Sequence, residues 1–573
     1  MPRSFATHAA ACVPLSDAYP MEIATGVGVA LGTADPVPTG AAVAVGVVAC
    51  PPHAASSITM AAGNAIRRRP FISTPPDASL VARAGPQAAH GAALRCRTVG
   101  LRSREPAIAT RADATTAALA ERCAGVRWAD LETDVRERAK ELVLDLLGVA
   151  IRGSQEASGA VARETAVRLG RGTASVIGHP QGVGAAWAAL ANGTAGHSIE
   201  LDDVTTESSL HPGVATIPAA LAVAEERGTS GTAFLEAVVA GYEATMRVGN
   251  ALNPASAYRR GFHPTGVAGV FGATAATALL LGLDGATTAS AFGIAGTMAS
   301  GSLEYLSDGS WTKRLNPGWA GHSGIVAAEL AASGFRGPAT AIEGELGALR
   351  AFSDEPYRGR LSADDEWALM SVSIKPYACC RYNHGPIDGV LQLVRAHRLR
   401  PDDVARIRLG ITSGGALLVS EPIEAKREPH NVVDAQFSAP FAAAVALVRG
   451  AAGIDQYTQA NVDDPEIRAV MARVDCVRDP SLDAEYPARW PSTVAIELRD
   501  GRVLRTRVDD ATGEPANPVP RPALIEKFRS LAADHLPATD ELMTRVLALD
   551  AEPDVRRIGE LLRRVGPHGH THG

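Results

Sequence analysis

The stretch from Thr133 to Gly153 reads TDVRERAKELVLDLLGVAIRG and gives the clearest sign of the fold. Its apolar residues recur at helical spacing and are Val135, Ala139, Leu142, Val143, Leu146, Leu147 and Ala150. Thr133 is a suitable N-cap, Asp134 suits the positive end of a helix dipole, and Gly153 follows the last turn. The stretch therefore predicts one long amphipathic helix.

Similar segments rich in alanine and glycine follow this helix. They cover residues 183–191, 217–226, 233–248, 267–281 and 324–332. Asn192 and Gly193 break the first of these patterns, so that helix is expected to end near Leu190. No strand pattern of comparable strength occurs between about residues 130 and 350, which predicts a largely α-helical domain.

The pattern changes after about residue 370. Residues 404–412 alternate apolar and polar side chains, and two β-prone runs, 493–498 and 503–508, flank Asp500-Gly501. An Asp-Gly pair between such runs indicates a β-hairpin. Residues 387–397 are helical candidates, and 522–565 return to helical spacing.

These patterns predict a mainly α protein with a large helical domain and a smaller α+β lid domain. The chain is expected to divide into five parts, which include these two domains. The first 111 residues are rich in Ala, Pro, Gly and Arg and are expected to be disordered. The expected parts are a low-complexity extension at 1–111, the helical domain at 112–372, the lid at 373–516, C-terminal helices returning to the helical domain at 517–566, and a disordered tail at 567–573.

The composition excludes several classes of protein. The formal net charge of -7 argues against a nucleic-acid-binding surface. Seven scattered cysteines without a CxxC pair favour a reducing compartment, hence the cytoplasm. The most apolar early stretch, 26–49, contains Asp35 and two prolines, so no membrane span is expected.

The segment from Asn192 to Pro212 concentrates charge inside apolar sequence. It places four acids, Glu200, Asp202, Asp203 and Glu207, between His197 and His211. Such residues bind a ligand or transfer protons. A purely structural alternative is that Asp202 and Asp203 cap a helix and pair with arginines.

Three further clusters carry polar groups that suit anion chemistry. His263 stands just before a glycine-rich helical stretch, where backbone N–H groups favour an anion. The second holds Lys313 and Arg314, and the third, 375–384, holds Lys375, Cys379, Cys380, Arg381 and His384. No P-loop, GxGxxG, HExxH or GxSxG motif occurs. This inventory fits an acid/base enzyme without a cofactor that acts on a multiply anionic small molecule.

Several short sequence motifs occur in the same order as in the MmgE/PrpD family, and the chain from about 113 to 540 resembles that family. The family includes 2-methylcitrate dehydratase, cis-aconitate decarboxylase and iminodisuccinate epimerase. The motifs are residues 139–148, 192–197, 201–203, 211–213, 261–264, 312–313 and 375–377. The resemblance implies a helical domain and an α+β lid with the active site between them. It also implies a homodimer that needs no metal or organic cofactor.

The resemblance also implies roles for individual residues. His211 and His263 would serve as general base and acid, Lys313, Lys375 and Arg381 would hold substrate carboxylates, and Glu200 or Asp203 would orient a histidine. Asp202, Cys380 and His384 are expected to contact the substrate. Glu200 stands where the family usually has Asp, and Cys380 where its decarboxylase branch often has His. The expected reaction is therefore dehydration of a di- or tricarboxylate. Epimerisation and decarboxylation are the alternative reactions, in that order.

Two alternatives come from other classes of protein. A metal-dependent all-α enzyme would use Asp202, Asp203, His197 and His211 as ligands for Mg²⁺ or Zn²⁺. A non-catalytic member of the family would bind a carboxylate without turnover.

Overall fold

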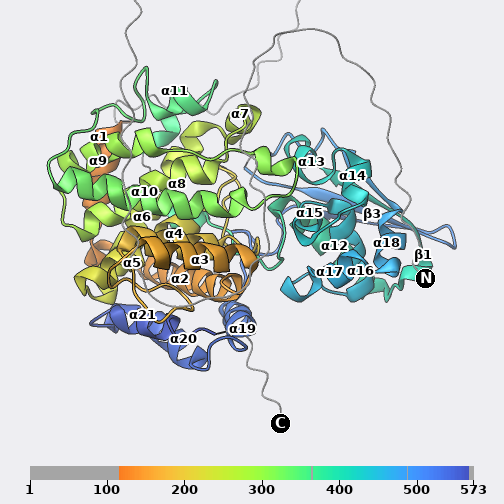
Figure 1. Ribbon diagram of the computed structural model, residues 1–573. Helices are drawn as coiled ribbons and strands as arrows, with labels where there is room; N and C mark the ends of the chain where they lie inside the picture. The colour runs from red at the N-terminus through yellow and green to blue at the C-terminus, as the bar shows by residue number, and fades with distance from the viewer. Residues whose placement is uncertain (1–114, 363–365, 487, 567–573) are drawn as a thin grey trace, which may run out of the picture. The chain divides into compact units, whose positions relative to one another are not determined.

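The computed structural model describes residues 115–362, 366–486 and 488–566 (Figure 1). All of them belong to the unit formed by residues 100–573. The predictions for the extension at 1–111 and the tail at 567–573 lie outside the described residues.

Helices make up the first part of this unit. They are α1 (Thr116–Ala124), α2 (Thr133–Gly153), α3 (Ala157–Leu169), α4 (Ala185–Gly196), α5 (Gly213–Arg227), α6 (Gly231–Leu252), α7 (Pro254–Arg259), α8 (Pro264–Leu280), α9 (Gly285–Met298), α10 (Thr312–Ala332) and α11 (Ala348–Phe352). Short 3-10 helices lie at Trp128–Asp130, Glu304–Leu306, Arg358–Leu361 and Ala368–Ser371.

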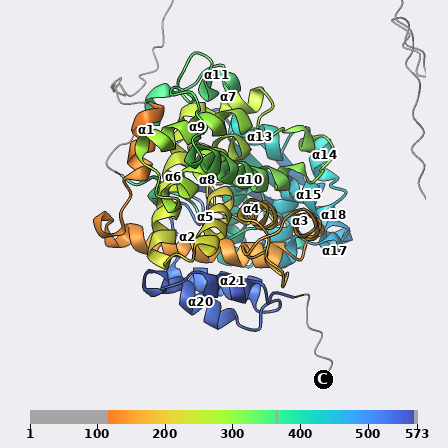
Figure 2. The ribbon, with the colours of Figure 1, turned by 60° about the vertical axis from the view of Figure 1, so that its left-hand side comes forward.

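Helix α8 forms the centre of this part, against α6 and α10 (Figures 1 and 2). All but one of its residues are buried, and most are Gly, Ala or Thr. Small side chains let neighbouring helices approach closely: a Cβ atom at Gly272 would lie 2.6 Å from the carbonyl oxygen of Gly241 in α6. Small side chains in place of aromatic ones therefore allow the close packing between these helices.

A four-stranded sheet organises the second part, with strand order β2-β1-β3-β4. Its strands are β1 (Val404–Ile411), β2 (Val474–Arg478), β3 (Ser492–Leu498) and β4 (Val503–Val508). Strand β1 pairs parallel with β2 and antiparallel with β3, and β3 pairs antiparallel with β4. The predicted hairpin around Asp500-Gly501 is confirmed, whereas the sequence pattern missed β2, which is only five residues long.

Helices accompany this sheet. They are α12 (His384–His397), α13 (Ser413–Val419), α14 (Ile423–Arg427), α15 (Val432–Gln436), α16 (Ala439–Arg449), α17 (Gln459–Val462) and α18 (Pro465–Met471). Helix α12 packs against β3, β4 and α16. Shorter 3-10 helices lie at Arg381–Asn383, Pro401–Asp403 and Ile454–Gln456.

The last helices pack against the first part of the chain (Figure 1). They are α19 (Arg521–Ala532), α20 (Thr539–Leu547) and α21 (Arg556–Leu562), with a 3-10 turn at Leu549–Ala551. Phe528 of α19 lies on Gly148 of α2, where a Cβ atom would come within 3.0 Å of its ring. Lys527 donates to the Asp145 carboxylate at 2.6 Å and to the Leu201 carbonyl at 3.1 Å. Helix α19 therefore supports the segment that carries the acids.

The predicted fold class is confirmed, mainly α with a small α+β part. Two local predictions are wrong. Helix α4 continues through Asn192 and Gly193 to Gly196. The Asn192 side chain bonds to the backbone at Ile177 and Ser175, and Gly193 allows α10 to approach, so both residues have packing roles. Glu132 takes the N-cap position of α2 without a side-chain bond, and Thr133 is the first helical residue.

Within the described ranges, no helix combines the length and the apolar character that a membrane span needs.

Replacing Phe528 with Ala tests the docking of α19. The ring is 1% exposed, and truncation leaves a cavity against α2. We expect a loss of about 3–5 kcal/mol in the free energy of unfolding, measured by urea denaturation. Arg529→Ala is the control, because its ion pair with Asp540 is largely exposed and contributes at most about 1 kcal/mol. Equal losses in the two variants would contradict this packing role.

Candidate active site

A small inner cavity of about 40 Å³ lies where residues of the helical part meet residues of the α+β part. Its lining includes Glu200, Ser209, His211, Tyr258, His263, Tyr305, Lys313, Lys375, Cys380, Arg381, Tyr382 and Trp490. An outer chamber of about 650 Å³ shares Glu200, Tyr305, Leu306, Lys313, Leu418 and Phe437 with this lining. The two spaces therefore have a common wall.

The loop between α4 and α5 carries the acids and is tied to the segment that carries Lys375. Val204 and Ser373 exchange two backbone hydrogen bonds, of 3.0 and 2.7 Å. Glu200 has a φ of 56°, in the left-handed region that a non-glycine residue rarely adopts. The sharp turn at Glu200 places its side chain and that of Asp202 in different surroundings.

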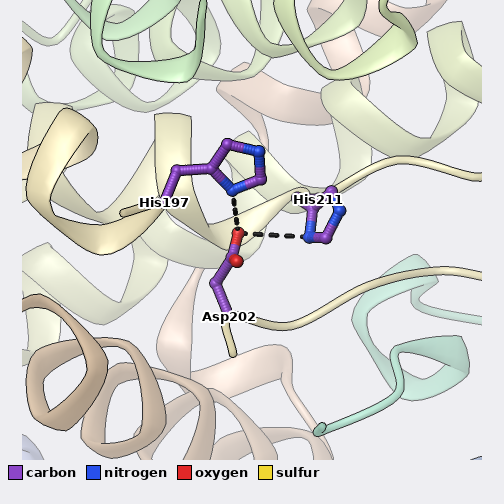
Figure 3. A group of neighbouring side chains, drawn as sticks. All are labelled: His197, Asp202 and His211. Atoms are coloured by element: carbon purple, nitrogen blue, oxygen red, sulfur yellow. Dashed lines mark hydrogen bonds and ion pairs between the residues drawn. The ribbon is translucent and has the colours of Figure 1, made fainter. Parts of the chain in front are cut away.

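The Asp202 carboxylate binds two histidines, as Figure 3 shows. Its Oδ2 atom lies 2.8 Å from Nδ1 of His197 and 3.1 Å from Nδ1 of His211. The same nitrogen of His211 lies 2.7 Å from the backbone oxygen of Asp203. Because a carboxylate and a carbonyl both accept, Nδ1 of His211 must carry the proton. The lone pair of its Nε2 atom is therefore free for a base.

His263 carries its ring proton on Nε2, whereas His211 carries its ring proton on Nδ1. His263 occupies the N-cap position of α8, and the side-chain amide of Asn316 donates to its Nδ1 atom at 3.2 Å. The proton of the neutral ring is then on Nε2, so this histidine offers a donor. The two histidines that line the cavity are thus a candidate base and a candidate acid.

Burial sets the charge of these groups. It lowers the pKa of His211 to about 4, although Asp202 opposes the shift. Burial and the nearby Lys313 ammonium hold the pKa of His263 well below its usual value. Burial by itself raises the pKa of Asp202, but His197 and His211 outweigh it and keep that pKa well below the ordinary range. At neutral pH both cavity histidines are neutral and Asp202 is ionised.

Glu200 lies between the two lysines of the cavity. Its Oε1 atom forms an ion pair with Lys313 of α10, and Lys375 donates to its backbone oxygen at 3.1 Å, with Oε2 3.8 Å away. Burial raises the pKa of the Glu200 carboxyl, but Lys313, His197 and Lys375 outweigh it, and the pKa lies well below its usual range. Glu200 is therefore an anion that bridges cations from sequence-distant segments.

Arg381 and Cys380 complete the polar wall. Arg381 pairs with the buried Glu514, which also accepts from the Ser373 hydroxyl at 2.7 Å. Burial lowers the pKa of Arg381 to about 10, which leaves it charged at neutral pH. Burial raises the pKa of Cys380, so its sulfur is a neutral thiol.

Three predicted site residues do not line the cavity or the chamber. The Asp203 carboxylate accepts from the Tyr242 hydroxyl at 2.6 Å and from the Gly213 amide at 3.1 Å. Asp202 lies behind His211, and His384 packs against the Tyr377 ring with centroids 5.2 Å apart. In this geometry Asp202 orients a histidine, a role that the sequence assigned to Asp203 or Glu200. A catalytic part for Asp203 and a part in substrate binding for Asp202 and His384 stay predictions.

The metal alternative named four ligands, and three of them come together. Candidate ligand atoms of His197, Asp202 and His211 lie within 4.8 Å of one another. The carboxylate of Asp203 contacts Tyr242 and Gly213 instead. A metal at this group would have to displace the Nδ1 protons of both histidines.

Several residues of the site carry no recognisable signal in the sequence. Asn316 fixes the His263 ring, and Tyr258, Tyr305 and Trp490 line the cavity. Each belongs to a segment without a recognisable catalytic motif. Tertiary packing brings them together, so spacing along the chain could not reveal them.

Comparison with known proteins assigns the chain to a family. It matches the MmgE/PrpD N-terminal domain over residues 117–359 and the MmgE/PrpD C-terminal domain over residues 377–552. The protein belongs to the MmgE/PrpD family, which confirms the resemblance seen in its sequence.

Three relatives show which enzyme activities are named among similar proteins. A cis-aconitate decarboxylase of Aspergillus terreus is 28% identical over 463 residues, covering 76% of this chain and 92% of that protein. The Homo sapiens cis-aconitate decarboxylase is 26% identical over 459 residues, with 77% and 93% covered. The mitochondrial 2-methylcitrate dehydratase of Yarrowia lipolytica is 30% identical over 142 residues, with 22% and 25% covered. These relatives are enzymes, which supports an enzyme here.

Replacing Asp203 with Asn tests whether burial keeps the Asp203 carboxyl protonated. Burial, with Asp202 adding to it, raises the pKa of Asp203 to about 7, above its usual value of about 3.9. Between these values the folded protein keeps a proton that the unfolded chain loses, so this group's stabilisation is lost as pH rises from about 4 through 7.

We expect Asp203→Asn to gain stability relative to wild type between pH 5 and pH 8, by about 1.4 kcal/mol per pKa unit crossed. Urea denaturation at both pH values measures this difference. Asp308→Asn, at an exposed aspartate, is the control. A wild-type-to-variant difference that is equal at pH 5 and pH 8 would show that Asp203 does not titrate in this range.

Proposed function

We propose that the protein is an acid/base lyase that dehydrates a di- or tricarboxylate. The observation that carries this proposal is the pair of neutral histidines in a cavity lined by cations. His211 offers a lone pair at Nε2, and His263 offers a proton at Nε2. A base and a hydrogen-bond donor in one cavity suit the removal of a proton and of a hydroxyl group from neighbouring carbons.

In the proposed reaction, Nε2 of His211 removes a proton from the carbon next to a substrate carboxylate. The electron pair of the broken C–H bond moves into that carboxylate, and Lys313 and Lys375 stabilise the charge that develops there. The Asp202 carboxylate stabilises the imidazolium that forms on His211. The C–O bond then breaks, the His211 imidazolium gives the proton it removed to the leaving hydroxyl, and His263 donates a hydrogen bond from Nε2 to the same oxygen. A C=C bond and water result, and both histidines are neutral again.

The charge state of the histidines favours dehydration over decarboxylation. Removal of a proton needs a base that is neutral at the start, and burial keeps both rings neutral. Decarboxylation is the second candidate, because the A. terreus and human relatives carry the name cis-aconitate decarboxylase.

The direct experiment is NMR of 2-methylcitrate and cis-aconitate incubated with the full chain in D₂O. We expect loss of water from 2-methylcitrate. Release of CO₂ from cis-aconitate without any dehydration would replace the proposal with decarboxylation.

His211→Gln is expected to lower kcat by about 10² to 10⁴, because the glutamine side chain cannot act as a base. Steady-state kinetics on the substrate found by NMR measures this loss. His397→Gln is the matched control, because His397 is exposed at the end of α12 and lines neither the cavity nor the chamber. Wild-type turnover in His211→Gln would remove this residue from the mechanism.

The metal alternative makes a different prediction. In the proposed mechanism the Nδ1 protons of His197 and His211 are held by Asp202, so no ion is needed there. We expect dialysis against EDTA to leave turnover unchanged and elemental analysis to find less than one metal ion per ten chains. Loss of activity on chelation, with recovery on adding Zn²⁺ or Mg²⁺, would support a metal enzyme instead.

A further inference from the structure

We propose that Lys527 and Asp145 form a positioning pair that holds the Asp202 carboxylate within reach of the candidate base His211. Neither side chain of the pair is among those that line the inner cavity or the outer chamber. This inference rests on the proposed lyase function and adds two residues that act on the base through the loop between α4 and α5. It follows from one shared ammonium group, from the planarity of a peptide bond and from the cost of a buried charge.

The Lys527 ammonium group joins two helices to the loop that carries the acids. It extends from α19 and donates to the Asp145 carboxylate of α2 at 2.6 Å and to the Leu201 carbonyl at 3.1 Å. The Lys527 side chain is 11% exposed and that of Asp145 is 1% exposed, so water competes little for these bonds. One cation therefore holds the loop against both helices.

The bond to the Leu201 carbonyl fixes the backbone at the start of Asp202. The peptide bond between these two residues is planar, so a carbonyl that is held in place also fixes the amide and the Cα atom of the next residue. From that Cα atom the Asp202 carboxylate must reach Nδ1 of His197 at 2.8 Å and Nδ1 of His211 at 3.1 Å. A misplacement of about 1 Å in a site of this kind lowers a rate by about 10²-fold.

Helix α2 holds the loop at a second point. Arg138 lies two turns before Asp145 on the same face of α2, and it donates to the Val372 carbonyl at 2.6 Å. Val372 precedes Ser373, whose backbone pairs with that of Val204. One face of α2 thus supports the loop on both sides of its two aspartates.

Stability alone does not account for the carboxylate of Asp145. Burial raises the pKa of this group, and the nearby Lys527 and Arg138 cations do not fully offset that shift. Among the described residues, its Oδ2 atom has no hydrogen-bond partner. Replacing a buried ion pair with apolar residues is often neutral or stabilising, and α19 already docks through the Phe528 ring on Gly148. The bond from Lys527 to the loop is the feature that a purely stabilising pair would not need.

The test separates the loss of a charge pair from the loss of the bond to the loop. Lys527→Met leaves Asp145 buried without its cation, so it should lower both kcat and the urea concentration at half unfolding. The double variant Lys527→Met/Asp145→Asn removes the unpaired charge as well. We expect its stability in urea to return toward wild type, while kcat stays about 10- to 100-fold below wild type and KM is unchanged.

Two further variants serve as comparisons. Asp145→Asn alone keeps an oxygen that accepts from Lys527, so the bond to Leu201 and most of kcat should remain. Arg521→Met/Glu137→Gln is the matched control, because this pair also joins α19 to α2, at 2.8 Å, but its side chains are 41% and 37% exposed. The control should leave kcat unchanged. If kcat of Lys527→Met/Asp145→Asn returns together with its stability, the pair is only structural and the inference is overturned.

A measurement without turnover keeps this inference separate from the proposed function. Nitrogen-15 NMR of histidine-labelled full-length protein distinguishes the two ring tautomers, and the His211 signals are those that disappear in His211→Gln. Wild type and the control should keep the proton on Nδ1, whereas Lys527→Met/Asp145→Asn should show a share of the Nε2-protonated form. If no substrate is turned over, the lyase proposal fails and the NMR result alone decides the positioning role. A His211 tautomer that is unchanged in the double variant would overturn that role.

Discussion

The buried Asp202 carboxylate is the interaction on which the candidate site depends. It accepts from His197 and His211, two residues that lie on either side of the loop between α4 and α5. A buried carboxylate without such donors would bind a proton and lose its charge. With them it stays ionised, fixes the proton on Nδ1 of His211 and frees the Nε2 lone pair. The loop conformation and the candidate base therefore depend on the same two hydrogen bonds.

A second buried anion, Glu200, connects segments that are far apart in sequence. Its carboxylate binds Lys313 of α10, and its backbone oxygen accepts from Lys375, which follows the segment paired with the loop. Each lysine has further N–H donors, so a substrate carboxylate can join this group without displacing Glu200. Helix α19 supports the same loop from behind through Lys527 and the Leu201 carbonyl. The geometry of the candidate site is therefore maintained by several segments that are far apart in sequence and not by one motif.

Much of the fold could be predicted from the sequence because its signals are local. The helical spacing from Thr133 gave α2 within one or two residues at each end, and Asp500-Gly501 gave the β3–β4 hairpin. The prediction that α4 ends near Leu190 is wrong, because it rests on the intrinsic propensities of Asn192 and Gly193 alone. In the structure the Asn192 side chain satisfies two backbone groups, and Gly193 lets α10 approach. Tertiary packing outweighed intrinsic propensity at this point.

The sequence by itself determined the fold class, the family and which segments carry acids, histidines and lysines. Only the tertiary structure decided which acid does what. Asp202 and Asp203 are neighbours in the chain, yet one contacts His197 and His211 and the other contacts Tyr242. The tautomers of His211 and His263 and the room in the cavity likewise depend on groups brought together by folding. Local order encodes periodicity and motifs, whereas charge, proton position and free volume depend on the side chains that surround each group in space.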